Sequence, residues 1–143
     1  MNEHRDTGLR LTPQRIAILD CLKGNKRHPS AEDIYRVVRI KFPTMSFATV
    51  YSTLAVLKEK RKVVELTIDA GKKRYDPETL SHNHLICVVC KKIVDAATSD
   101  TPRLRGREEQ GFKLIASHTD FYGLCPGCRE HYAGQEDNYV CRS

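Results

Sequence analysis

Two Cys-x-x-Cys pairs, Cys87-Val88-Val89-Cys90 and Cys125-Pro126-Gly127-Cys128, constrain the fold of this chain more than any other feature. Each pair can present two thiolates to one ion from a tight turn, and four thiolates form the closed tetrahedral site that suits structural zinc, Zn²⁺. Such a site contributes directly to the free energy of folding. The alternative is two redox dithiols, although neither pair clearly follows a strand and opens a helix in a βαβ unit as a thioredoxin-like motif does. We therefore predict structural zinc on Cys87, Cys90, Cys125 and Cys128.

The bulk composition indicates a globular protein. The 143 residues suit one ordinary domain or two small ones, and small units often depend on a metal or on oligomerisation. Hydrophobic residues make up 40% and charged residues 29% of the chain. No stretch approaches the roughly 18 apolar residues of a membrane span, and the polar N-terminus lacks the apolar segment of a secretory signal. We expect a cytoplasmic protein without a membrane partner.

The excess of positive over negative charge is confined to the first half of the chain. Residues 1–80 contain 16 Lys and Arg against 10 Asp and Glu, whereas residues 81–143 contain 8 of each kind. This asymmetry favours a polyanion such as nucleic acid as the partner of the first half. A Lys-rich solvated surface is the alternative, because a net charge of +6 is not extreme.

Three short helices are predicted in the first half. Thr12-Pro13 supplies a hydroxyl N-cap and a proline at the first helical position, and Gly24 fits the stop. Ser30, with Asp33 three residues later, approximates a capping box, and Ser46 begins the third helix. Apolar residues recur at helical spacing in the second and third helices: Ile34, Val37, Val38, Ile40, Val50, Leu54 and Leu57.

A β-hairpin is predicted next, because residues 63–68 are β-branched and partly alternating, residues 69–71 supply turn chemistry and residues 72–76 return. Three helices and a hairpin form the layout of a winged helix-turn-helix, whose third helix enters the DNA major groove. The expected DNA contacts are Arg15, Ser46, Thr49, Tyr51, Ser52, Lys72, Lys73 and Arg74. A bundle that binds protein is the alternative, since apolar spacing alone does not exclude it.

A second set of metal-ligand residues precedes and follows the first cysteine pair. His82 and His84 are two residues apart, and alternate residues of a strand share a face, so both imidazoles could reach one ion. Asp76, Asp95 and His28 stand alone, and a lone residue of these types is more often solvated than a ligand. Three imidazoles and two carboxylates would form a mixed N/O site, which favours iron(II), manganese(II) or zinc over copper(I).

Six motifs stand in a specific order and spacing. They are Leu11-Thr12-Pro13-Gln14-Arg15, the segment from His28 to Tyr35, Ala48-Thr49-Val50-Tyr51, Arg74-Tyr75-Asp76, the segment from His82 to Cys90, and the segment from Tyr122 to Cys128. Together they resemble the ferric uptake regulator family from about Gly8 to Glu130. The resemblance implies an α+β fold: a winged helix-turn-helix DNA-binding domain with a hinge over residues 1–78, and a small α/β metal-binding dimerisation domain over residues 79–143.

The resemblance also implies function and partners. It indicates a metal-dependent transcriptional repressor, not an enzyme, that binds an AT-rich inverted repeat of double-stranded DNA as a homodimer. It assigns structural zinc to the four cysteines. The family's regulatory site falls here on His28, Asp76, His82, His84 and Asp95. Filling this site would clamp the two halves into a DNA-competent geometry by population shift.

The two carboxylates distinguish branches of the family. Peroxide-sensing regulators typically have aspartate at both positions, as here at Asp76 and Asp95, whereas iron-uptake regulators usually have glutamate. In the peroxide branch, Fe²⁺ in the site reacts with hydrogen peroxide, a ligand histidine is oxidised and the repressor leaves DNA, while Mn²⁺ supports DNA binding without that sensitivity. We expect His28 or His84 to be oxidised. A regulator of metal uptake that responds to metal level alone is the alternative.

The chain departs from the family pattern at three places. Ser81, Asn83 and Ser117 stand where iron-uptake regulators often carry a further metal site, so that site is expected to be absent or altered. Lys60-Arg61-Lys62 stands where the turn usually has glycine, which adopts a left-handed C-cap at little cost. Residues 96–111 favour helix poorly, so the family's interface helix is not expected at full length.

The remaining cysteines lie outside both pairs. Cys21, on the first predicted helix, is expected to be a buried apolar filler. Cys141, in the polar tail, is expected to be a free thiol, with a redox role as the alternative.

Other functions fit the residues less well. Zinc deaminases need a His-x-Glu triplet, but this triplet ends in His84. Zinc held by four thiolates has no open position for a hydrolytic water. A zinc-containing dithiol oxidoreductase and a zinc-stabilised protein-binding module remain as alternatives, and metal-dependent DNA binding would distinguish a regulator from the module.

Overall fold

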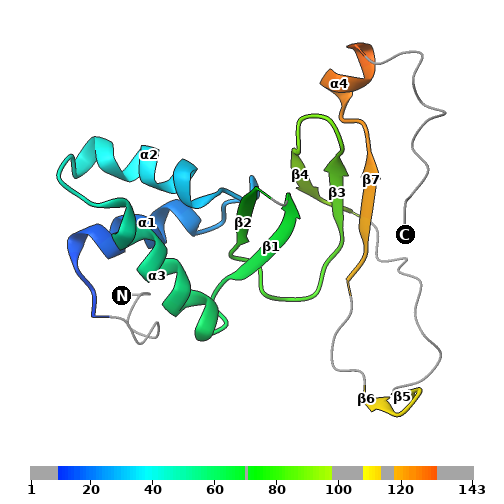
Figure 1. Ribbon diagram of the computed structural model, residues 1–143, viewed down its shortest axis with the longest axis horizontal. Coiled ribbons are helices and arrows are strands. Elements are labelled where there is room, and N and C mark those ends of the chain that lie inside the picture. Colours follow the sequence, from blue (N-terminus) through cyan, green and yellow to red (C-terminus); the bar gives the residue numbers. More distant parts are fainter. Residues whose placement is uncertain (1–9, 70, 98–107, 114–117, 132–143) are drawn as a thin grey trace. The chain divides into compact units, whose positions relative to one another are not determined.

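The computed structural model describes residues 10–69, 71–97, 108–113 and 118–131, and it divides into two compact units, Met1–Ser81 and His82–Ser143 (Figure 1). The helices are α1 (Pro13–Leu22), α2 (Ala31–Lys41), α3 (Phe47–Glu59) and α4 (Pro126–His131). The strands are β1 (Val64–Asp69), β2 (Lys72–Asp76), β3 (His84–Cys87), β4 (Ile93–Asp95), β5 (Glu108–Glu109), β6 (Phe112–Lys113) and β7 (Asp120–Gly123). Among the helices of the described residues, none is long and apolar enough to cross a membrane.

The three helices of the first unit begin at the predicted caps. The side chains of Thr12 and Ser46 each accept a backbone N–H bond, at 3.3 Å, from the residue three positions later. Ser30 and Asp33 form a complete capping box: Ser30 Oγ accepts from the Asp33 N–H at 3.2 Å, and Asp33 Oδ2 accepts from the Ser30 N–H at 3.0 Å. These bonds satisfy N–H groups that the first helical turn leaves without partners.

One hydrophobic core joins these helices to the following hairpin. Its buried members are Ile18, Leu22, Ala31, Ile34, Val38, Met45, Val50, Leu54, Leu57, Val63 and Tyr75. Not every apolar residue of α2 belongs to this core, because Val37 and Ile40 are 57% and 81% exposed. At about 100° per residue, Val37 lies about 80° and Ile40 about 140° from the centre of the face that carries Ile34 and Val38. Cys21 was expected to be a buried apolar filler. It packs against this core but is only partly buried.

The hairpin of the first unit confirms the winged-helix layout. Strands β1 and β2 pair antiparallel, with Val64 opposite Asp76 and Leu66 opposite Arg74. The loop before α2 joins this hairpin, because Ser30 forms a β-bridge with Arg74 and the Tyr75 N–H donates to the Pro29 carbonyl at 2.9 Å. These contacts hold the residues just before α2 beside the end of β2.

The main sheet of the second unit has the strand order β4-β3-β7. Strand β3 pairs antiparallel with β4 and parallel with β7, so His84 lies opposite both Asp95 and Asp120. Because side chains alternate along a strand, these three polar residues share one face of the sheet, and Leu85 and Val94 lie on the other. Strand β3 begins at His84, so His82 precedes the strand. The prediction that both histidines lie on one strand was therefore wrong for His82.

Some expectations concern residues outside the described part of the chain. These residues are Ser117, Cys141 and residues 98–107, which form part of the segment 96–111 discussed above as an interface helix. The described end of that segment does not continue a helix: Glu108–Glu109 forms β5 and pairs with Phe112–Lys113.

The turn after α3 yields a prediction about stability. Arg61 has φ +56°, and Lys62 N–H donates to Leu57 O at 2.8 Å while Arg61 N–H donates to Lys58 O at 3.0 Å. These two bonds form a Schellman motif, whose left-handed position normally carries glycine. Arg61→Gly is expected to raise the free energy of unfolding by about 1 kcal/mol, because glycine avoids the clash of Cβ with the following carbonyl.

Urea unfolding of the zinc-loaded protein measures this effect. Arg61→Ala is the matched control, because it removes the same charge but keeps Cβ, and it should give no gain. An equal gain in both variants would assign the effect to charge and not to backbone conformation.

Candidate metal centres

The four cysteines predicted to hold zinc converge within the second unit. Their four Sγ atoms all lie within 4.8 Å of one another, and the Sγ atoms of Cys90 and Cys125 are 3.7 Å apart. Sulfurs bound tetrahedrally to zinc at about 2.3 Å lie roughly 3.8 Å from one another, so the donor set fits a zinc ion. Cys87 ends β3, Cys125 precedes α4 and Cys128 lies on α4, so the fold of this unit positions the cluster.

The electrostatics of the cluster also fit a cation. Burial raises the pKa of Cys87, but N–H donors from the backbone of Cys125, Cys90 and Val89 outweigh it and lower the pKa to about 6. Hydrogen bonding with the Cys125 thiol is the main cause that raises the pKa of Cys128 to about 12. Thiols this close together cannot all ionise unless a cation compensates their charge, so a bound metal would complete the deprotonation.

The expected absence of a βαβ unit around the cysteine pairs holds in the described residues, because no strand follows α4 there. Cys125 follows β7 and Cys128 lies on α4, so the second pair does follow a strand and open a short helix. The contact between Cys90 and Cys125, however, joins one pair to the other. Two independent dithiols do not need that contact, whereas a shared zinc site does.

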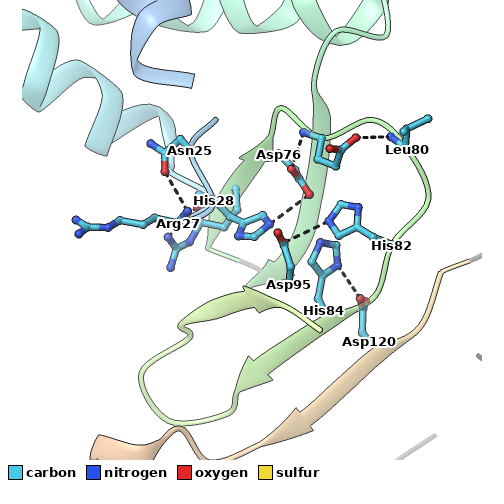
Figure 2. Close-up of polar contacts among 11 residues, drawn as sticks. Asn25, Arg27, His28, Asp76, Leu80, His82, His84, Asp95 and Asp120 are labelled. Carbon is cyan, nitrogen blue, oxygen red and sulfur yellow. Dashed lines mark hydrogen bonds and ion pairs between the residues drawn. The ribbon is translucent and has the colours of Figure 1, made fainter. Parts of the chain in front are cut away.

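In the first unit, His28 and Asp76 form a buried pair. His28 Nε2 lies 3.2 Å from Asp76 Oδ2, and the two residues are 0% and 3% exposed (Figure 2). His28 has φ +51°, a left-handed conformation that histidine adopts more readily than most residues. Its carbonyl accepts a hydrogen bond from Arg74 Nη1 at 3.1 Å, on the strand that ends at Asp76. The pairing of the loop with β2 therefore brings together two residues that are far apart in sequence.

In the second unit, two imidazoles and a carboxylate lie together. The ring centroids of His82 and His84 are 4.5 Å apart with an interplanar angle of 73°, and His82 Nε2 lies 3.4 Å from Asp95 Oδ1 (Figure 2). The backbone N–H of Ala96 donates to the Asn83 carbonyl at 2.8 Å, which fixes the end of β4 beside these histidines. Each unit thus carries N and O donors of the kind that suits Fe(II), Mn(II) or Zn(II).

One polar partner in the second unit was missed from the sequence. His84 Nδ1 lies 3.2 Å from Asp120 Oδ1 (Figure 2). His118 Nε2 lies 3.9 Å from Asp120 Oδ2. The contact with His84 depends on the parallel pairing of β3 with β7, which joins segments 36 residues apart. The only local signal was a carboxylate at the start of a short strand, two residues after a histidine.

The residues expected to contact DNA differ in exposure along α1 and α3. Ser46, Tyr51 and Ser52 are exposed, whereas Thr49 and Arg15 are half-buried. Tyr51 is held by a T-shaped contact with Phe47, at 4.8 Å between ring centroids. The first half of α3 therefore presents hydroxyl groups on its surface.

The basic residues of the hairpin have partners within the first unit. Lys73 Nζ lies 3.2 Å from Glu65, and its side chain is 54% exposed. Lys72 Nζ and Arg74 Nη1 lie 3.8 Å and 3.9 Å from Asp33, and the Arg74 side chain is only 17% exposed. Arg74 therefore supports the loop that carries His28, whereas Lys73 faces solvent.

Known proteins resemble this chain over most of its length. The family model described as "Ferric uptake regulator family" matches residues 6–122. The chain is 42% identical over 126 residues to the "Peroxide operon regulator" of Bacillus subtilis, which covers 87% of each chain. It is 38% identical over 128 residues to the "Peroxide-responsive repressor PerR" of Staphylococcus epidermidis, which covers 88% of this chain and 85% of that relative. The solved ferric uptake regulator from Francisella tularensis with iron aligns with a TM-score of 0.72 and 27% identity, over 85% of this chain and 96% of the other.

Proposed function

This chain belongs to the ferric uptake regulator family, and we propose that it is a DNA-binding repressor that senses hydrogen peroxide through oxidation of a metal-bound histidine. Regulators of this family are metal-dependent, bind DNA as dimers and are not enzymes. The assignment to the peroxide-sensing branch rests on the two carboxylates beside the histidines, both of which are aspartates. Asp76 lies next to His28, and Asp95 lies next to His82. The 42% identity with a protein named for a peroxide operon supports the same branch.

We assign the regulatory metal to five ligands: His28, Asp76, His82, His84 and Asp95. Their match to the family motif supports this set, as does the burial of His28, Asp76 and His84. Two ligands belong to the first unit and three to the second. An ion held by both units would favour the DNA-binding arrangement only through its differential affinity for that arrangement.

Bound Fe(II) would activate the O–O bond of hydrogen peroxide for cleavage, and the imidazole that gains oxygen would be the net source of electrons. The protein provides the target, because the fold holds in place His28 and His84, two imidazoles of the proposed ligand set. In the net reaction, one oxygen atom of peroxide is added to an imidazole ring and the other leaves as water. An oxidised ring is a poorer ligand, so the site loses its ion and the protein releases DNA. With Mn(II) in the site, we expect DNA binding without this sensitivity.

The proposed DNA target is an AT-rich inverted repeat read by two copies of the first unit. The exposed polar face of α3 would lie in the major groove. Lys73 on the hairpin would meet phosphates or the narrow minor groove of AT-rich sequence. The second unit would supply the homodimer contact, and Leu85 and Val94, exposed at 47% and 37% on the apolar face of its sheet, suit that role.

An anaerobic DNA titration tests this proposal. The protein is loaded with Fe(II) or Mn(II), bound to an inverted-repeat duplex and given a stoichiometric dose of hydrogen peroxide. We expect release of the Fe(II) form alone, with the mass of one oxygen atom gained on a peptide that contains His28 or His84. If both forms stay bound, the protein responds to metal level only. Failure to bind any duplex in a metal-dependent way would contradict the repressor function itself.

A further inference from the structure

We propose that Asp120 is a positioning residue that fixes which ring nitrogen of His84 carries the proton, and thereby sets the affinity of the regulatory site for its ion. This inference deepens the proposed function and rests on it. Asp120 belongs to none of the motifs that identified the site, and its role follows from the sheet of the second unit.

The register of that sheet places Asp120 directly beside His84. The two residues are partners in the parallel ladder of β3 and β7, so their side chains leave the same face of the sheet. The result is the 3.2 Å contact between His84 Nδ1 and Asp120 Oδ1 (Figure 2). His84 is only 3% exposed, so few solvent molecules compete for this contact.

The backbone holds the Asp120 carboxylate in this position. The His84 N–H donates to the carbonyl of Thr119 at 3.1 Å, and the Thr119 N–H donates to Asn83 Oδ1 at 3.0 Å. Asn83 is itself 5% exposed. Thr119, which precedes Asp120, is therefore hydrogen-bonded to both Asn83 and His84, and these bonds keep the Asp120 carboxylate against the imidazole ring.

Asp120 contacts a different ring nitrogen of its histidine from the one contacted by each of the two aspartates assigned as ligands. Asp76 and Asp95 each lie beside the Nε2 atom of a histidine, His28 and His82 respectively, where imidazole and carboxylate can share an ion. Asp120 instead lies at Nδ1 of His84. That placement suits a carboxylate that acts through the ring.

The chemistry of imidazole gives this contact its consequence. A neutral ring has one N–H and one lone pair, and an ionised carboxylate can only accept. Asp120 therefore favours the proton on Nδ1 and leaves the Nε2 lone pair for a metal. The negative charge also strengthens Nε2 as an electron donor to a metal ion, and loss of such a partner typically lowers metal affinity about 10–100-fold.

Affinity for Mn(II), measured on zinc-loaded protein without DNA by electron paramagnetic resonance of the free ion, tests the inference. Asp120→Ala is expected to weaken Mn(II) binding about 10–100-fold. Asp120→Asn should weaken it less, because its amide oxygen can accept the same hydrogen bond without the charge. His118→Gln is the matched control, since it removes the other imidazole near Asp120, and it should bind Mn(II) like the original protein. Zinc content and circular dichroism establish that each variant is folded.

A second readout follows the proton directly. In ¹⁵N NMR spectra of the zinc-loaded protein without Mn(II), His84 should carry its proton on Nδ1. Asp120→Ala should shift the tautomer population, and Asp120→Asn should shift it less. A proton on Nε2 in the original protein would overturn the inference. So would unchanged Mn(II) affinity of Asp120→Ala when His84→Ala loses binding. If His84→Ala also keeps full affinity, the proposed regulatory site fails, and the inference fails with it.

Discussion

Replacing Cys90 with serine is expected to remove the structural zinc and to unfold the second unit. Binding of structural zinc contributes about 10–16 kcal/mol in small zinc domains, more than the net stability of a domain of this size. Cys90 is the informative choice because its side chain is exposed, so the substitution removes a zinc ligand and little buried packing. Zinc content and far-ultraviolet circular dichroism measure the effect.

Cys21→Ser is the matched control for this experiment. Cys21 is a partly buried cysteine of the first unit, outside the cluster, and burial is the main cause that raises the pKa of its thiol. We expect this variant to keep full zinc and to lose only about 1 kcal/mol of stability, as is typical of single substitutions. If Cys90→Ser also kept its zinc and its fold, Cys90 would not be a ligand and the shared four-cysteine zinc site would be wrong.

The elements that were predicted correctly are those determined by neighbouring residues. The N-caps at Thr12, Ser30 and Ser46 and the strand-turn-strand pattern after α3 each depend on bonds within a few residues, and all are present. The burial of α2 was harder to predict. Val37 and Ile40 are apolar, but only the position of the other core elements decides which face of α2 turns inward.

The candidate site shows the same limit more clearly. The cysteine pairs could be recognised because ligands within a pair are close in sequence. His28 and Asp76 were connected only by resemblance to a family, since their contact depends on a β-bridge between Ser30 and Arg74. Asp120 was not found, because no motif carries it and its contact requires the parallel register of β3 and β7. Contacts that arise from pairing of distant strands are the part of a site that spacing does not reveal.

Replacing His28 with alanine is expected to abolish metal-dependent DNA binding while leaving the structural zinc in place. His28 is fully buried, and it is the only imidazole that the first unit contributes to the proposed ligand set. The other proposed ligand from that unit is Asp76. Without it, the ion loses much of its differential affinity for the DNA-binding arrangement. We expect the affinity for an inverted-repeat duplex in the presence of Mn(II) to fall at least about 100-fold, since loss of a ligand exceeds loss of a supporting residue.

His118→Ala provides the control, because His118 is also a histidine but its side chain is 61% exposed and it lies outside the proposed ligand set. Fluorescence anisotropy of a labelled duplex, with and without Mn(II), measures both variants. The control should match the original protein, and the two variants should share the same weak binding without metal. Persistence of full metal-dependent binding in His28→Ala would remove the first unit's histidine from the site and contradict the five-ligand assignment.

Linkage makes the same experiment a test of how the ion acts. If Mn(II) raises affinity for DNA by some factor, DNA must raise affinity for Mn(II) by the same factor. The original protein should therefore bind Mn(II) more tightly in the presence of the duplex, and His28→Ala should lose this dependence even if the second unit's His82, His84 and Asp95 still hold the ion weakly. A variant that binds Mn(II) but no longer couples it to DNA would identify His28 as the ligand through which the metal acts on the DNA-binding unit. Equal coupling in both proteins would place that role on Asp76 alone.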